Sequence, residues 1–128
     1  MVAAVLLLLA SCGSEPNIDE VVARTGESSY GSPGLIGVTI TNNSSEAVQS
    51  SFCPVSFDRR SGDAWEATLV EEPCHRVTDF VPAGGDVTPL VSVPAGLAAG
   101  DYRIRFAPLA TENGQPLGTL YTNTFRIE

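Results

Sequence analysis

The sequence predicts an all-β fold, an antiparallel β-sandwich of about seven or eight strands. Short runs in which apolar and polar residues alternate are separated by clusters of Gly, Pro, Asn and Ser along most of the chain. No segment after the apolar start has a helical period. The 128 residues suffice for one domain, and two packed sheets are expected because neither could bury its apolar face alone.

The individual strands follow from period-two patterns. Ile36, Val38 and Ile40 alternate with smaller or polar residues, which predicts a half-buried strand that ends at the Asn and Ser turn 42–45. The stretch "RRSGDAW" has the Ser-Gly-Asp composition of a hairpin turn. The predicted strands are 36–40, 47–57, 65–70 as the returning partner of the hairpin, 87–93, 102–106 and a last strand marked by Tyr121, Phe125 and Ile127.

An apolar segment, Val2 to Leu9, precedes the domain. It has the length of a signal-peptide core and is far shorter than the roughly 20 residues that span a bilayer as a helix. Leu9, Ala10, Ser11 and Cys12 resemble the lipobox of bacterial lipoproteins. That resemblance implies cleavage before Cys12, attachment of diacylglycerol to its sulfur, and a protein held on a membrane by its lipid chains.

The predicted organisation is therefore a signal peptide at 1–11, a lipidated cysteine with a short tether at 12–18, and a domain at 19–128. In two-membrane bacteria, Gly13 after the cysteine implies sorting to the outer membrane, hence a cell-envelope location. The segment has no Lys or Arg after Met1, which indicates a start further upstream or a fragment. A buried N-terminal strand and an ordinary secretory signal are the alternatives.

Two further cysteines, Cys53 and Cys74, would lie in an oxidising compartment, where we expect them to form a disulfide. Closing the loop between them would stabilise the fold by roughly 3 kcal/mol. A zinc site formed with His75 is the alternative, but it lacks CxxC spacing and an evident fourth ligand. We therefore expect no metal and no cofactor.

Tyr102 follows Gly100 at the start of a predicted strand, where immunoglobulin-like folds place a tyrosine corner. An ordinary core tyrosine is the alternative. Together with "GVTITNNSSEAV" and "RRSGDAW", this order of landmarks resembles small bacterial immunoglobulin-like domains of secreted lipoproteins. The resemblance covers nearly the whole chain after the signal and implies an immunoglobulin-like sandwich. Ile104 occupies the place of the second intersheet cysteine of antibody domains, so the bridge here must lie elsewhere.

The charge balance and the missing motifs exclude several functions. All seven basic residues are arginine, against fifteen acids, so the net charge is -8 and nucleic acid is not an expected partner. A single histidine, no lysine and no GxSxG, HExxH or SxxK motif predict a protein that is not an enzyme. The acidic pairs Asp19-Glu20 and Glu71-Glu72 lack the spacing of a calcium loop. The Asn-x-Ser motifs at Asn42 and Asn43 are read as turn residues.

Two function classes remain. The favoured one is a passive module that binds an envelope protein or polymer, or has a structural role. The other is a proteinase inhibitor, because "TNNSSEAV" and Asp58, Gly62 and Trp65 resemble the bacterial intracellular proteinase inhibitor family. Arg59, Arg60 and Trp65 are the candidate interface residues, since arginine and tryptophan are frequent in interface hot spots. The alternative is that Trp65 covers the core while the arginines pair with acids.

The lipid anchor gives a first testable prediction. Protein isolated from membranes should begin at Cys12 and carry lipid mass on that residue, because the short apolar segment cannot itself hold the chain in a bilayer. Intact-mass spectrometry measures this directly. Cys12→Ala protein should leave the membrane fraction; its retention there, or an unmodified Cys12, would contradict the prediction.

Overall fold

The computed structural model describes residues 16–52, 55–70 and 79–128. Within these residues the fold is all-β, as the sequence predicts, with one short 3₁₀-helix and no α-helix. Thirteen strand segments are present in this part of the chain, against the roughly seven or eight predicted. The predicted strands 47–57 and 87–93 are each divided in two, and the strands at 21–25, 29–30, 79–81, 109–111 and 116–118 were not predicted from the sequence. Within the same residues no helix is long and apolar enough to cross a bilayer.

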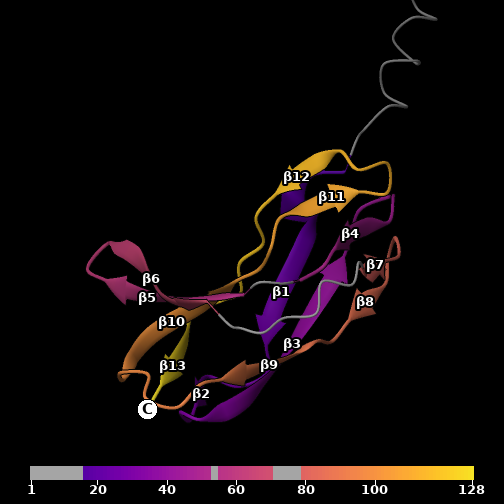
Figure 1. Cartoon of the computed structure of the whole chain (residues 1–128). Helices are drawn as coiled ribbons and strands as arrows, with labels where there is room; N and C mark the ends of the chain where they lie inside the picture. Colours follow the sequence, from indigo (N-terminus) through magenta and orange to yellow (C-terminus); the bar gives the residue numbers. More distant parts are fainter. Residues whose placement is uncertain (1–15, 53–54, 71–78) are drawn as a thin grey trace, which may run out of the picture.

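The strands form three sheets, each named here by one of its strands (Figure 1). The β3 sheet contains β1 (Val21–Thr25), β3 (Gly34–Asn42), β8 (Asp86–Val87) and β9 (Leu90–Val93). The β10 sheet has the order β2 (Ser29–Tyr30), β13 (Phe125–Ile127), β10 (Gly100–Arg105), β5 (Ser56–Ser61) and β6 (Ala64–Val70). The β11 sheet has the order β12 (Pro116–Gly118), β11 (Leu109–Thr111), β4 (Val48–Ser50) and β7 (Asp79–Val81). All paired strands are antiparallel except β2 and β13.

The core lies between the β3 sheet and the other two sheets. Ile36, Val38 and Ile40 are fully buried, so the predicted alternation of this strand is confirmed. The buried side chains that they join come from the β10 sheet (Phe57, Tyr102, Ile104, Phe125, Ile127) and from the β11 sheet (Val48, Val81, Leu109). One continuous apolar cluster therefore holds the layers together.

The layer opposite the β3 sheet is divided because three neighbouring strands are interrupted at the same level. The predicted strand 47–57 is two strands, β4 and β5, with Phe52 at a φ of 51° between them. The gaps between β10 and β11 and between β12 and β13 lie beside the gap between β4 and β5. Phe52 and Phe106 pack edge to face across the break, with ring centroids 5.9 Å apart, which closes the apolar core there.

The prediction of the last strand was wrong at its first residue, Tyr121. Phe125 and Ile127 are buried in β13, but Tyr121 lies in the interrupted segment and is 40% exposed. Leu120, one residue earlier, is the buried side chain instead. An irregular segment shifts the period by a residue, so alternation alone assigned Tyr121 to the wrong side of the sheet.

Residues 16–18, the described part of the tether predicted at 12–18, are structured. Pro16 is buried, and Asn17 caps the 3₁₀-helix η1 (Ile18–Glu20) with a capping box completed by Glu20. Ile18 packs against the core. The acidic pair Asp19-Glu20 thus belongs to a helix start. Cys12, Cys53, Cys74, His75 and Glu71-Glu72 lie outside the described residues.

Tyr102 is 1% exposed, and its hydroxyl donates a hydrogen bond of 2.7 Å to the carbonyl of Ala98. The acceptor lies four residues upstream, in the turn that leads into β10. The side chain therefore fills the core, and its hydroxyl is hydrogen-bonded and fastens the turn to the sheet.

Asn42 joins three segments at the end of β3. Its amide nitrogen donates to the carbonyls of Glu46, Val81 and Pro82, and its side-chain oxygen accepts from the backbone N–H and hydroxyl of Ser44. The residue is fully buried, whereas Asn43 beside it is exposed. The predicted turn is therefore built around a buried amide that also holds the end of β7.

This arrangement predicts that Asn42→Asp lowers the free energy of unfolding by about 3 kcal/mol, because a carboxylate cannot donate to the three carbonyls that surround it. Urea unfolding measures the loss. Asn43→Asp is the matched control and should change stability by less than about 0.5 kcal/mol. Equal effects of the two substitutions would refute the structural role of the Asn42 amide.

Candidate binding site

The strands β5 and β6 form a hairpin that extends away from the body of the molecule (Figure 1). Its two-residue turn is Gly62-Asp63, with Gly62 at a φ of +62°, so the hairpin predicted from "RRSGDAW" is confirmed. Near the base of the hairpin the register shifts, and Thr68 is the extra residue of a β-bulge. The hydroxyl of Thr68 donates a hydrogen bond of 2.7 Å to the carbonyl of Phe57. Bulges increase strand twist, which helps to turn the hairpin away from the sheet.

The three candidate interface residues do not share one face. Arg60 pairs with Trp65 directly across the hairpin, and its guanidinium lies 5.9 Å from the centre of the indole ring. Arg59 points the other way because side chains alternate along a strand. Its guanidinium donates to the carbonyl of Ala99 at 2.9 Å and lies so close to Gly100 that a Cβ there would meet its Nε at 2.9 Å. Arg59 therefore holds the start of β10, whereas Arg60 and Trp65 belong to the outer face of the sheet.

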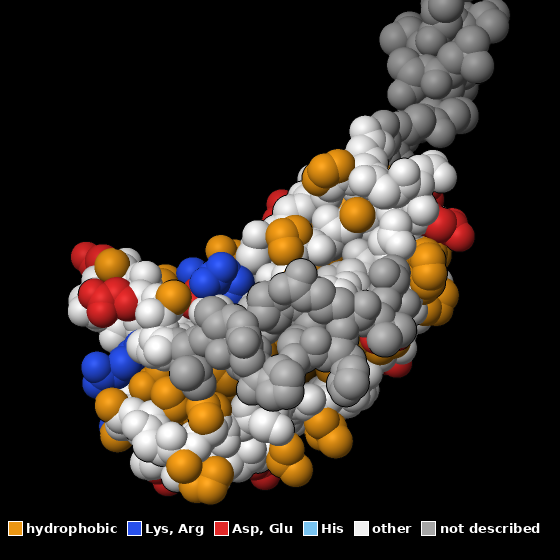
Figure 2. All heavy atoms as spheres, in the orientation of Figure 1, with side chains coloured by type: hydrophobic (Ala, Val, Ile, Leu, Met, Phe, Trp, Pro, Cys, Tyr) orange, Lys and Arg blue, Asp and Glu red, His pale blue; other side chains and the backbone are white. Residues whose placement is uncertain are grey.

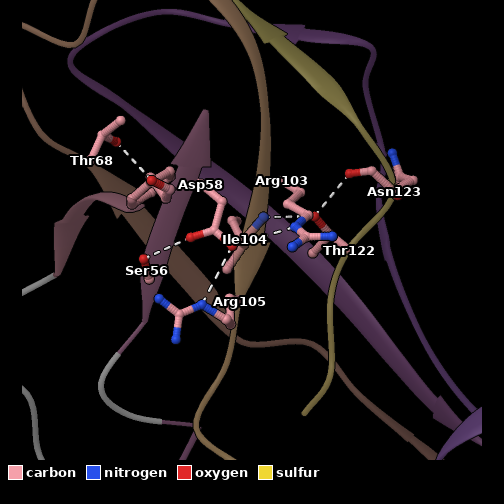
Figure 3. Close-up of polar contacts among 9 residues, drawn as sticks. Ser56, Asp58, Thr68, Arg103, Ile104, Arg105, Thr122 and Asn123 are labelled. Carbon is pink, nitrogen blue, oxygen red and sulfur yellow. Dashed lines mark hydrogen bonds and ion pairs between the residues drawn. The ribbon is translucent and has the colours of Figure 1, made fainter. Parts of the chain in front are cut away.

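Asp58 is the buried carboxylate at the base of this outer face, with 5% of its side chain exposed (Figure 3). One oxygen accepts from the hydroxyl of Ser56 at 3.0 Å. The other lies 3.3 Å from Nε of Arg103 and 3.4 Å from Nε of Arg105. A carboxylate taken out of water needs such partners, and two guanidinium groups supply them here from the neighbouring strand.

The guanidinium of Arg103 lies between two aromatic rings. Its central carbon is 4.5 Å from the ring centre of Trp65 and 3.9 Å from that of Tyr121. Both distances fall within the range of cation–π attraction. Since Asp58 holds Nε and the two rings contact the planar group, these contacts together restrict the orientation of Arg103.

Tyr121 reaches this place through the interrupted segment between β12 and β13. Thr122 exchanges two hydrogen bonds with Ile104: its backbone N–H donates to the Ile104 carbonyl, and its hydroxyl accepts from the Ile104 N–H (Figure 3). The same hydroxyl donates to the carbonyl of Asn123. Because Thr122 is buried and hydrogen-bonded to β10, the preceding residue, Tyr121, lies on the outer face. An isolated antiparallel β-bridge pairs the backbone of Tyr121 with that of Arg105.

We call this group of six residues the arginine–aromatic face: Asp58, Arg60, Trp65, Arg103, Arg105 and Tyr121. Three arginines and one aspartate give it a positive balance on a chain whose net charge is -8. Figure 2 shows arginine side chains gathered beside the projecting hairpin, and within the described residues no carboxylate forms an ion pair with Arg60. The face is thus locally cationic and partly aromatic.

Sequence reasoning selected Arg60 and Trp65 but missed Asp58, Arg103, Arg105 and Tyr121 as members of the site. Arg103 and Arg105 alternate with core residues in β10, so their outward position was readable. Their acidic partner lies on another strand, 45 positions from Arg103, and that pairing depends on strand register, which the sequence does not display. The alternative that Arg59 and Arg60 pair with acids is not met within the described residues, where the ion-paired arginines are Arg103, Arg105 and Arg126.

Beside this face, a groove of about 510 Å³ runs between β1 and the segment 119–123, and Tyr121 forms part of its wall. A smaller hollow of about 160 Å³ lies at the break between the β10 and β11 sheets, with Arg105 and Thr119 in its wall. In the ranges 16–52, 55–70 and 79–128, no three His, Cys, Asp or Glu residues are grouped so that they could hold a metal ion.

Comparison with known proteins finds no matching family model and no matching curated protein. Among solved structures, the alkylpurine DNA glycosylase AlkC of Pseudomonas fluorescens, bound to DNA containing an abasic site analog, is similar with a TM-score of 0.42 and 13% identity. The match covers 95% of this chain and 33% of that one, so the chain spans about a third of the glycosylase. A Niemann-Pick type C2 protein from Japanese carpenter ant has a TM-score of 0.41 and 13% identity, with 91% and 96% covered. Values this low do not establish a shared fold.

The stacked arginine can be tested through Trp65, the single tryptophan of the chain. Arg103→Gln should change the fluorescence of the folded protein and lower its free energy of unfolding by about 1–2 kcal/mol, because Asp58 loses one of two guanidinium partners. Urea unfolding followed by fluorescence measures both. Arg126→Gln, which breaks an exposed ion pair, is the control and should leave fluorescence unchanged. Identical spectra for both variants would show that Arg103 does not lie against the indole.

Proposed function

We propose that this protein is a non-enzymatic, lipid-anchored module of the cell envelope, with an immunoglobulin-like fold, that binds a partner through the arginine–aromatic face. The partner class is an envelope protein or polymer. The observation that carries the binding proposal is the Arg103 guanidinium held between the rings of Trp65 and Tyr121 above the buried Asp58.

The immunoglobulin-like assignment is supported by strand order. In immunoglobulin variable domains the strands G, F, C and C′ are neighbours in one sheet, and A, B and E lie in the other. The order β13-β10-β5-β6 fits the first set and β1-β3-β9 fits the second. Tyr102 lies at the start of β10, the equivalent of strand F, and its bond to Ala98 fits a tyrosine corner.

The anchor proposal is supported by the lipobox resemblance that ends at Cys12. The domain is packed from Pro16 onward, only a few residues further along the chain. On this proposal a short link joins the membrane to the 3₁₀-helix η1, so the domain is held close to the bilayer surface. The proposed partner is therefore one that approaches the same surface.

The binding role is supported by the composition and rigidity of the face. Tryptophan, tyrosine and arginine are the residue types most enriched in interface hot spots. Here the rings of Trp65 and Tyr121 and the guanidinium of Arg103 fix one another, so few rotamers remain to be lost on binding. A surface whose large side chains are ordered in advance binds with a smaller entropic cost.

The non-enzymatic role is supported by the state of Asp58. Both oxygens of this carboxylate are engaged, one by Ser56 and one by two arginines. A general base needs a free oxygen within reach of the substrate proton. The group therefore fits a structural role, in which it orients the arginines, better than proton transfer.

The proposed function predicts a partner captured from one face alone. The photo-crosslinking amino acid p-benzoyl-L-phenylalanine at position 121, which keeps an aromatic ring at this exposed place on the arginine–aromatic face, should capture a single partner in intact cells. The same amino acid at position 90 is the control, because Leu90 is 70% exposed on the β3 sheet. Adding Arg60→Ala to the position 121 protein should reduce capture severalfold without changing the melting curve.

Equal capture from positions 121 and 90, or none from position 121, would reject the binding face. The inhibitor alternative has a separate readout. A serine proteinase that is captured and also slowed stoichiometrically by purified protein would replace the passive module by an inhibitor.

A further inference from the structure

The hollow of about 160 Å³ lies on the same side of the molecule as the arginine–aromatic face, at the break between the β10 and β11 sheets. Residues of three chain segments surround it: Val55, Ser56, Arg105, Phe106, Ala107, Pro108 and Thr119. Most of these side chains are apolar or small. The polar groups of the wall are one guanidinium and two hydroxyls.

Arg105 contributes unused hydrogen-bond donors to this hollow. Its Nε is engaged by Asp58 at 3.4 Å, and 39% of its side chain is exposed. Figure 3 shows its two terminal nitrogens directed away from Asp58. Within the described residues no group accepts a hydrogen bond from these nitrogens, and none bonds to the hydroxyl of Thr119.

The charge at this point is only partly neutralised. One oxygen of Asp58 serves both Arg103 and Arg105, so two positive charges share one negative charge. Val55 and Phe106 are buried against the hollow, which lowers the local dielectric constant and strengthens any charged contact formed there. The two terminal nitrogens of a guanidinium match the two oxygens of a carboxylate.

We propose that this hollow binds a single carboxylate group, presented by an Asp or Glu side chain of a partner protein. The proposal rests on the proposed function, because it names the group that the arginine–aromatic face recognises. Arg105 would form a charge-assisted bond to the carboxylate, and Thr119 would donate its hydroxyl to the same group. The rings of Trp65 and Tyr121 would contact the surface around the inserted side chain.

The net charge of the protein decides between a single carboxylate and an extended polyanion. A chain of net charge -8 repels a polymer of many negative charges over a Debye length of about 8 Å at physiological salt. A lone carboxylate on a neutral or basic protein surface avoids that repulsion and still reaches Arg105. Acidic polysaccharides and anionic lipid headgroups are therefore disfavoured.

The test uses the full chain, labelled with ¹⁵N and held in detergent micelles, and N-acetyl-L-glutamic acid α-amide as the probe. The probe should shift the resonances of the Arg105 Nε–H and the Thr119 amide with a saturating dependence on concentration. N-acetyl-L-glutaminamide has the same shape without the charge and should leave both resonances unchanged. Equal shifts by both compounds, or none by either, would overturn the proposal.

Three variants locate the contact. Arg105→Gln should weaken probe binding by about tenfold or more, and Thr119→Val by about threefold. Arg126→Gln removes the same charge from β13 and should bind the probe as the unaltered protein does. If Arg105→Gln fails to fold, Thr119→Val decides, because it keeps the shape of the residue; unchanged binding by that variant then refutes the site.

The outcome is separable from that of the capture experiment. Capture through position 121 without any response to the glutamic acid probe would overturn the carboxylate site and leave the binding face standing. A specific response to the probe without capture would establish the hollow and reject the proposed partner-binding role.

Discussion

A buried carboxylate determines how the outer face of the β10 sheet is arranged. Asp58 has almost no contact with water, so its charge must be matched within the protein, and β10 provides the two arginines that do so. With its Nε bound to Asp58, Arg103 also places its planar group against the rings of Trp65 and Tyr121. The hairpin, β10 and the segment before β13 are thus connected through one side chain.

The shared break in three strands gives this arrangement its space. An uninterrupted last strand would place residue 121 by strict alternation, whereas the irregular segment, fastened by Thr122, puts Tyr121 on the outer face. The same break opens the hollow beside Arg105. The break in the strands therefore produces both features of the candidate site, because three uninterrupted strands would leave neither the Tyr121 ring on the outer face nor the hollow beside Arg105.

Local patterns predicted much of the fold and little of the site. The alternation in β3 and β10 and the Gly-Asp turn of the hairpin are short-range signals, so these elements could be read from the sequence. The partners of Asp58, the stacking of Arg103 and the position of Tyr121 depend on contacts between distant segments. Such contacts follow from strand register and from breaks, which composition and period leave open.

The base and the tip of the projecting hairpin differ in their contacts. Its base, at Asp58 and Thr68, is tied into the sheet, whereas the residues around Gly62 and Asp63 are exposed. Substitutions or short insertions at the tip can therefore accumulate at little cost to folding, provided that a turn-forming residue remains at position 62. Related chains could diversify what they recognise by altering this tip while inheriting the same scaffold, and the tip is equally a place where a foreign epitope can be inserted for display.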